Sequence, residues 1–372
     1  MATDTPIADP SLDPILADLA ELVGVESPSH DLVALQRCAE VLAGIVERRL
    51  GTRPELVDTP AGPIVHWRAP GEAKVLILGH HDTVFPIGTL ARRPFAVADG
   101  CATGPGVFDM KAGIVQAIHA VAALADPSGV EIMMTPDEEV GSEASRALLE
   151  ARAAACGRVL VLEPSADGGA LKTGRKGVGT FEVVVHGKAS HAGLEPEKGV
   201  NSLVAAAELI GSIATFGDPA LATTVTPTMA TAGTAENVVP AETRVRVDVR
   251  IVEPAEQQRL EGAMTALAER GTSVAGATIE ILGGINRPPM HPRASAALFP
   301  VAVEAARAAG IGDVDGVAVG GGSDGNFTAA LGIPTLDGLG AVGGGAHADH
   351  EYVVVATIVP RTRMLAELMS RL

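Results

Sequence analysis

Aromatic residues are scarce in this chain. Phe, Trp and Tyr make up 2% of its 372 residues, with one Trp and one Tyr. Proteins that bind single-stranded nucleic acids usually stack the bases on aromatic side chains. The composition therefore argues against that class. With 47% hydrophobic residues, a large core must be packed mainly from Ala, Val, Leu and Ile.

Cysteines are also few, and long apolar runs are missing. Cys38, Cys101 and Cys156 lie far apart without a CxxC spacing, which favours buried thiols in a reducing compartment over disulfides. No apolar run approaches the ~20 residues that cross a membrane. Met1–Thr5 lacks the basic and apolar parts of a signal peptide. We therefore expect a cytoplasmic protein.

Positive charge is outweighed by negative charge. The formal net charge is −17, which opposes binding to phosphate backbones and to anionic membrane surfaces. We expect neither a nucleic acid nor a membrane as partner.

The first half of the chain alternates helical and extended patterns, and its length suits two domains. Helical spacing of apolar residues covers 11–24, 31–49 and 112–125, and short apolar strands are predicted at Val75–Leu78, Val130–Met134 and Val159–Leu162. Strands that alternate with helices form mostly parallel sheets. We predict an α/β catalytic domain with a mostly parallel, helix-covered sheet.

The pattern changes near residue 178. Strands are predicted at Val178–His186, Thr223–Thr231, Glu242–Arg250 and Ala277–Leu282, with helices at Val200–Phe216 and Pro254–Arg270. Val245, Val247 and Val249 alternate with charged residues, as in a half-exposed antiparallel strand. The order β-α-β-β-α-β is that of the ferredoxin-like α+β fold.

We therefore predict an inserted domain at 178–286 within a discontinuous domain of residues 1–177 and 287–372. The latter resumes with a helix at 294–309, a strand at 314–319 and a helix from about 356.

Metal-type ligands follow the predicted strands of the first domain. His80 follows Val75–Leu78, Glu138 and Glu139 follow Val130–Met134, and Glu163 follows Val159–Leu162. In open α/β sheets the ligand crevice lies at the carboxyl ends of the strands. If Asp109 and His347 join these residues, carboxylates crowd around two imidazoles and repel one another unless cations bind.

Each candidate also has a role in this interpretation. Asp82 can hold the second N–H of His80, and Asp109 can bridge two metals. Of Glu138 and Glu139, one can bind metal while the other accepts a proton from water.

Every ligand also has a structural alternative. His80 and Asp82 could cap a strand end, Asp109 could cap the next helix, and Glu138 and Glu139 could form an acidic first helical turn. Glu163 could be a solvated loop acid and His347 a surface histidine. The joint occurrence at successive strand ends favours a metal centre.

The motifs that carry these residues resemble those of a known family. They are Gly79–Val84, Gly104–Lys111, Asp137–Ser142, Glu163–Ser165, Gly187–Gly193, Gly320–Asp324 and His347–Glu351. The chain resembles, over nearly its whole length, the co-catalytic zinc hydrolases that include glutamate carboxypeptidase, acetylornithine deacetylase, succinyl-diaminopimelate desuccinylase and aminoacylase-1.

The resemblance implies two Zn²⁺ per chain, although the same ligands accept Co²⁺ or Mn²⁺. One zinc would be held by His80, Asp109 and Glu163, and the other by Asp109, Glu139 and His347. It further implies that Asp82 orients His80 and that Glu138 is the general base and then the acid.

The resemblance also implies a homodimer formed through the inserted domain. His191 would reach the partner's active site to stabilise an oxyanion, with Asn237 assisting. Arg287 would bind the substrate carboxylate as a planar fork, together with backbone N–H groups around Gly321.

The expected activity is hydrolysis of an amide or peptide bond next to a free carboxylate, in a small-molecule substrate such as an N-acyl amino acid or short peptide. A carboxypeptidase, a dipeptidase and an N-acyl-amino-acid deacylase all fit. The alternatives are a non-catalytic binding protein on the same scaffold and an aminopeptidase-like enzyme without carboxylate preference.

The chain departs from the family in one respect. Glutamate-specific members carry a Lys a few residues after the zinc-binding Glu, and the matching position here is Ala170. Arg175 and Lys176 lie slightly further on. His81 and His350 have no role in the family pattern.

Overall fold

The chain divides into two compact units. A computed structural model describes residues 7–372, so the segment Met1–Thr5 lies outside the described residues. The first unit runs up to Gly174 and continues over His291–Val319 and Ser323–Leu372, and the second comprises Arg175–Met290 with Gly320–Gly322. Arg287 and Gly321 thus belong to the second unit. Among the described residues, no helix has the length and apolar character needed to cross a membrane.

The first unit is built on a six-stranded sheet of order β1-β2-β6-β3-β7-β14. Its strands are β1 (Glu55–Val57), β2 (Ile64–Arg68), β3 (Val75–His80), β6 (Val130–Thr135), β7 (Val159–Val161) and β14 (Thr335–Leu336). Strands β6, β3, β7 and β14 are parallel, and β2 and β1 add antiparallel strands at one edge. The predicted fold class, a mostly parallel helix-covered sheet, is confirmed.

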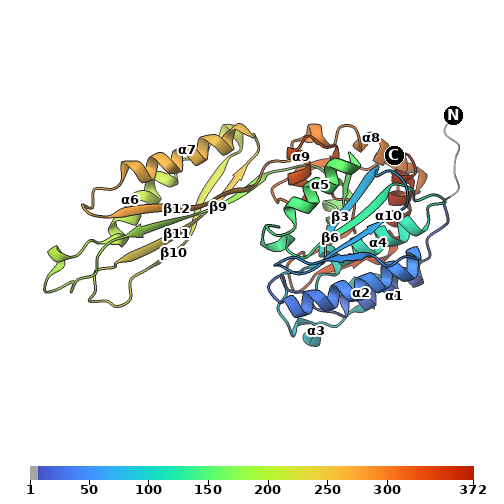
Figure 1. Ribbon diagram of the computed structural model, residues 1–372, viewed down its shortest axis with the longest axis horizontal. Coiled ribbons are helices and arrows are strands. Elements are labelled where there is room, and N and C mark those ends of the chain that lie inside the picture. Colours follow the sequence, from blue (N-terminus) through green and yellow to red (C-terminus); the bar gives the residue numbers. More distant parts are fainter. Residues whose placement is uncertain (1–6) are drawn as a thin grey trace. The chain divides into compact units, whose positions relative to one another are not determined.

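Helices cover both faces of this sheet (Figure 1). One core contains α1 (Leu12–Val23), α2 (Leu32–Leu50), α4 (Ala112–Ala122), α8 (Phe299–Ala308) and α10 (Val355–Met369); the other contains α5 (Arg146–Cys156) and α9 (Gly325–Ala330). Because successive strand residues point to opposite faces, Ile77 joins the first core, whereas Leu76 and Leu78 join the second. Burial on both faces explains why β3 is an unbroken apolar run until Gly79.

Two smaller sheets complete the first unit. β8 (Leu171–Arg175) pairs with β13 (Gly316–Val319), and β15 (Gly343–Gly344), β16 (Tyr352–Val354), β5 (Cys101–Thr103) and β4 (Ala96–Ala98) form a second sheet; α3 is Thr89–Arg92. β16 pairs with β5 antiparallel, with Tyr352 opposite Thr103. This pairing places the segment before β16, which contains His347, beside the segment after β5, which contains Asp109.

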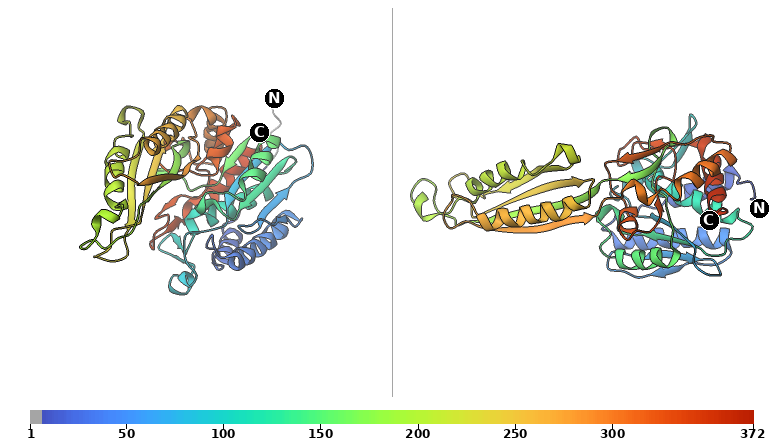
Figure 2. Two further views of the ribbon diagram at one scale, coloured as in Figure 1. Left: turned by 60° about the vertical axis from the view of Figure 1, so that its left-hand side comes forward. Right: turned by 90° about the horizontal axis from the view of Figure 1, so that it is seen from above.

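The second unit is one antiparallel sheet with two helices on a single face (Figures 1 and 2). Its strand order is β10 (Thr224–Ala232), β11 (Glu242–Ile251), β9 (Gly177–His186) and β12 (Thr278–Arg287), and its helices are α6 (Ser202–Ile213) and α7 (Ala255–Arg270). Val245, Val247 and Val249 pack into a core with both helices, while Arg246 on the other face is exposed. The predicted element order and the half-exposed antiparallel strand are confirmed.

Some predicted boundaries were wrong. The helix expected at 294–309 begins only at Phe299, because Pro292–Ala294 forms a separate 3-10 turn that the His291 side chain caps. β12 continues beyond Leu282 to Arg287, because Gly283 and Gly284 still pair with Phe181 and Thr180 of β9, and the register shifts at a bulge only between Ile285 and Arg287.

Candidate metal centre

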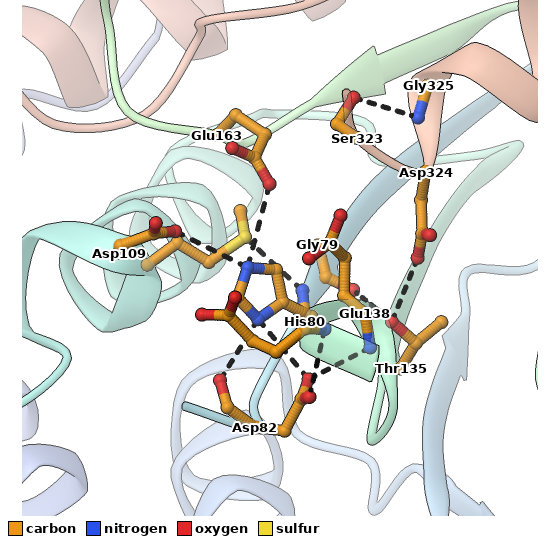
Figure 3. Close-up of polar contacts among 12 residues, drawn as sticks. Gly79, His80, Asp82, Asp109, Thr135, Glu138, Glu163, Ser323, Asp324 and Gly325 are labelled. Atoms are coloured by element: carbon orange, nitrogen blue, oxygen red, sulfur yellow. Dashed lines mark hydrogen bonds and ion pairs between the residues drawn. The ribbon is translucent and has the colours of Figure 1, made fainter. Parts of the chain in front are cut away.

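His80 ends the central strand β3 and is almost fully buried. Its Nδ1 lies 3.0 Å from the backbone oxygen of Asp82 and 3.3 Å from Asp82 Oδ1. Nε2 therefore faces the opposite side, where Asp109 and Glu163 point toward it (Figure 3). The adjacent His81 is turned away, with Nε2 2.9 Å from the backbone oxygen of Pro63.

Asp82 connects His80 to the turn that follows β6. Its carboxylate accepts hydrogen bonds from the backbone N–H groups of Glu138 and Glu139, both at 3.2 Å, and from Ser29 Oγ at 2.7 Å. Burial would raise the pKa of Asp82, but the hydrogen bond and charge of His80 outweigh it and lower that pKa. Asp82 is thus ionised, and it fixes both the orientation of the His80 imidazole and the backbone of Glu138 and Glu139.

Asp109 lies in the irregular helical turn Val107–Lys111 that precedes α4. At Gly106, just before this turn, the chain closely approaches the segment that follows β3, since a Cβ atom there would lie 2.6 Å from Thr83 Cγ2. Gly106 also has φ = 71°, which a residue without a side chain adopts at no steric cost. This glycine allows Asp109 to reach the end of the central sheet.

The carboxylate of Asp109 lies between two imidazoles. Its Oδ1 is 3.4 Å from His80 Nε2, and its Oδ2 is 3.2 Å from His347 Nε2. His80 Nε2 is also 3.5 Å from Glu163 Oε1, and His347 Nε2 is 3.2 Å from Glu139 Oε1. The five predicted ligands therefore form two groups of three that share Asp109.

These separations suit tetrahedral coordination. Zinc binds nitrogen and oxygen ligands at about 2.0–2.2 Å, so two ligands of one tetrahedron lie roughly 3.3–3.6 Å apart. Asp109 Oδ1 and Glu139 Oε1 are buried and accept no hydrogen bond from the described residues. Buried oxygens without donors are expected where a cation binds. The residues present therefore fit a pair of divalent cations.

The electrostatics of the centre support this interpretation. Burial acts to lower the pKa of His80, but the nearby carboxylates of Asp109, Asp82 and Glu163 raise it well above the usual value. The nearby carboxylates of Asp109 and Glu139 raise the pKa of His347 to about 10. Burial raises the pKa of Glu139. Both histidine pKa shifts arise from the surrounding carboxylates, whose negative charge bound cations would also compensate.

Glu138 lies beside the two groups of ligands. One of its carboxylate oxygens is within 4.8 Å of ligand atoms of His80 and Glu163. The side chain is 9% exposed and starts the turn Glu138–Val140. Asp137, one residue earlier, accepts hydrogen bonds from Ser145 Oγ at 2.6 Å and from Ala144 N at 2.9 Å, which fixes this turn.

The predicted substrate-binding residues lie in the second unit. His191 and Asn237 are exposed on neighbouring segments, joined by a hydrogen bond of 2.8 Å from Ala192 N to Asn237 O. Arg287 ends β12 and is 8% exposed. Its Cδ lies 3.2 Å from where a Cβ of Gly322 would stand, so the Gly320–Gly322 segment lies against Arg287.

Two residues of the centre had no assigned role in the sequence analysis. Glu351 is fully buried and accepts hydrogen bonds from the loop that carries Asp109. Its position inside the motif His347–Glu351 was a usable signal. Ser29, which donates to Asp82, lies in an ordinary loop, and no local pattern distinguishes it.

His350 is exposed, and Ala170 is buried at 7% exposure. Neither belongs to the two groups of ligands.

Comparisons with known proteins show the family to which the chain belongs. The chain is 31% identical over 375 residues to carboxypeptidase G2 of Pseudomonas sp. strain RS-16, covering 96% of this chain and 89% of the relative. It is 31% identical over 387 residues to a succinyl-diaminopimelate desuccinylase of Cereibacter sphaeroides, covering 94% and 96%.

Among solved structures, a metallo-carboxypeptidase of Sulfolobus solfataricus has the same fold, with a TM-score of 0.80 at 18% identity and coverage of 97% and 100%. The sequence model of Peptidase family M20/M25/M40 matches residues 76–371. The chain therefore belongs to Peptidase family M20/M25/M40.

Proposed function

We propose that this protein is a two-metal hydrolase that cleaves an amide or peptide bond next to a free carboxylate. The observation that carries the proposal is the Asp109 carboxylate, placed 3.4 Å from one imidazole nitrogen and 3.2 Å from another. His80, Asp109 and Glu163 would hold one cation, and Asp109, Glu139 and His347 the second, with zinc the first choice. When bound, the cations would polarise the scissile carbonyl and lower the pKa of the attacking water.

Glu138 is the proposed general base and acid. It is a carboxylate close to His80 and Glu163 that we assign to neither ligand group, and its backbone N–H donates a hydrogen bond to Asp82. In this position it accepts the proton of the attacking water and then donates it to the leaving nitrogen. Asp82 keeps Nδ1 of His80 occupied, so that Nε2 would be free to hold a bound cation.

The second unit is proposed to bind the substrate carboxylate through Arg287. A guanidinium matches a carboxylate with two parallel N–H donors. Backbone N–H groups around Gly321 would assist, and the contact between Gly322 and Arg287 supports their joint use.

His191 is proposed to donate a hydrogen bond to the developing oxyanion. Its Nδ1 accepts hydrogen bonds from the N–H groups of Gly193 and Leu194, both at 3.1 Å. Nδ1 is therefore unprotonated and Nε2 carries the hydrogen, which is the tautomer that a donor needs. We propose that His191 serves the partner chain of a homodimer formed through the second unit, with Asn237 beside it.

The cellular setting is proposed from the thiols. Cys38, Cys101 and Cys156 are all free, which supports a reducing compartment such as the cytoplasm.

The function is tested by metal analysis and a substrate screen. Purified protein is stripped of metal, reloaded with Zn²⁺, Co²⁺ or Mn²⁺, and assayed on N-acetyl, N-succinyl and folate-type amino-acid conjugates and on dipeptides. Two bound metals per chain and hydrolysis of at least one carboxylate-bearing class are expected. Well under one metal per chain in folded, metal-replete protein would contradict the proposal.

The screen includes substrates with and without an acidic side chain, because Ala170 stands where glutamate-specific relatives carry Lys. The variant Arg287→Ala tests the carboxylate preference. Its KM for carboxylate-bearing substrates should rise, and an unchanged KM would favour an aminopeptidase-like activity instead.

A further inference from the structure

Glu351 is a buried carboxylate that the proposed reaction does not use. It lies between His347 and β16, and its side chain is fully inaccessible to solvent. Oε2 accepts a hydrogen bond from Gly106 N at 2.9 Å, and Oε1 accepts from Phe108 N and Asp109 N, both at 2.8 Å. One carboxylate thus binds three backbone N–H groups of a loop more than 240 residues earlier in the chain.

The loop needs an acceptor of this kind. Backbone N–H groups at the start of a helical turn have no carbonyl partner within the helix. The turn Val107–Lys111 is buried at four of its five residues, so an N–H group left without a partner there would be strongly unfavourable. A carboxylate offers only acceptor sites, and hydrogen bonds to a charged acceptor are stronger than neutral ones.

The same segment also carries a ligand candidate. His347 precedes Glu351 by four residues, and its Nε2 faces Asp109 Oδ2 at 3.2 Å. Residues 347–351 therefore contact Asp109 twice, through the side chain of His347 and through the hydrogen bond from Asp109 N to Glu351. One short segment thus holds the backbone of Asp109 and also carries the second imidazole.

We propose that Glu351 is the positioning residue for the shared ligand Asp109, so that it controls the affinity of both metal positions at once. The proposal rests on the proposed two-metal function, in which Asp109 belongs to both ligand groups. Substitutions of groups that orient metal ligands typically weaken metal binding about 10–100-fold. Because Asp109 is shared, both metals should be affected together.

The test is the variant Glu351→Gln, which keeps the size of the side chain but replaces one acceptor oxygen by an N–H donor. Zinc affinities are measured by chelator competition, and Co²⁺ stoichiometry is followed by its absorption spectrum. The expected result is a 10–100-fold loss of affinity at both positions. Wild-type affinity at both positions, or weakening at only one, would overturn the proposal.

The matched control is Glu131→Gln. Glu131 lies on β6 and is 4% exposed. Its carboxylate contacts His66 Nε2 and Arg152 Nε, both at 2.9 Å. This variant also loses a buried carboxylate of the first unit, but Glu131 binds no loop of the metal centre. It should keep two metals with wild-type affinity, and a loss of metal equal to that of Glu351→Gln would attribute the effect to general destabilisation.

Two further measurements cover a variant that fails to fold. Glu351→Asp retains the charge with a shorter reach and should bind both metals with an affinity between those of wild type and Glu351→Gln. Hydrogen exchange in metal-free wild-type protein tests the anchor directly: the N–H groups of Phe108 and Asp109 should exchange slowly. Rapid exchange at both positions would overturn the proposal even if the wild-type protein binds two metals, whereas absence of metal binding by the wild type would contradict only the proposed function.

Discussion

On β11 of the second unit, charged side chains stand on the open face of the sheet, whereas Asp82 and Glu351 of the first unit lie buried next to the ends of strands. The side chain of Arg246 is 61% exposed and lies 4.0 Å from Glu182, while Asp82 and Glu351 are fully buried. Exposed ion pairs contribute about 0–1 kcal/mol, but buried charges are unfavourable by several kcal/mol unless they are compensated. The second unit is thus held by apolar packing, whereas the first contains buried carboxylates that need hydrogen-bond donors or bound cations to compensate them.

The largest effect should come from a charge that is not needed for folding. Glu138→Gln removes the proposed proton carrier while keeping its size and its backbone hydrogen bond to Asp82. We expect turnover to fall by roughly 10²–10⁴-fold, as when general acid–base groups are removed. Initial rates and metal content are measured together. A variant that keeps two metals and full turnover would remove Glu138 from the mechanism.

Metal removal should lower the thermal stability of the first unit but not that of the second. Cations bound at 1,000 times their Kd stabilise the unit that binds them by about 4 kcal/mol. Chelation should therefore lower the thermal transition of the first unit and leave that of the second unchanged. Calorimetry with and without chelator measures both. Equal shifts of the two transitions would mean that the centre supports the whole chain.

The stability contribution of a buried charge can also be tested at Asp18, which lies away from the strand ends. Asp18 joins α1 to α2 and α4 through Arg49 Nε at 2.7 Å, Arg48 Nη2 at 2.9 Å and His119 Nε2 at 2.7 Å. Burial would raise the pKa of Asp18, but these hydrogen bonds lower it below 3.8. Because its pKa is depressed on folding, its stabilisation is present above about pH 4 and is lost as pH falls through the folded pKa.

The variant Asp18→Asn should therefore lose about 2 kcal/mol at pH 7 and approach the wild type in stability as the pH falls toward 2. Denaturant unfolding of metal-free protein between pH 7 and pH 2 measures this. The control Asp248→Asn lies on the open face of the second unit, where Asp248 pairs with Arg250, and should change stability by less than about 0.5 kcal/mol. A constant difference between Asp18→Asn and wild type at all pH values would contradict the assigned role.

The smallest contrast lies within one strand. Val247 is fully buried in the second core, and its neighbour Arg246 is exposed. Val247→Ala should lower the free energy of unfolding by about 2 kcal/mol through the cavity it leaves. Arg246→Ala should change it by less than about 0.5 kcal/mol, and neither variant should alter metal content. Equal effects of the two substitutions would show that the open face is packed against another surface.

Strands of the second unit are buried on one face, whereas strands of the first are buried on both, and this difference determined which elements could be predicted from the sequence. In the second unit each strand has one buried face, so residues such as Val245 and Val247 alternate with charges and reveal strand, register and face. In the first unit, β2 was not predicted because four of its five residues are buried, including His66. The helix α5 was not predicted because only Leu149, Ala153 and Cys156 are buried in it.

The candidate site was predicted as far as its residues mark the ends of strands. His80 and Glu163 follow apolar runs, and parallel strands place those ends side by side. The contact from Glu351 to Gly106 depends on the pairing of β16 with β5, which joins two strands of three residues each. Strands that short carry no periodic signal, so no local pattern could place these groups together.

The hydrogen bonds between Arg175 and Met290 have a consequence for how the chain folds. Arg175 N donates to Met290 O at 2.9 Å, and Met290 N donates to Arg175 O at 3.0 Å. Without these contacts, the first unit would have to close a loop of more than a hundred flexible residues, at an entropic cost that grows with length. Once β9 and β12 have paired, Arg175 and Met290 are neighbours. The second unit then costs the folding of the first unit no more loop-closure entropy than a short turn would.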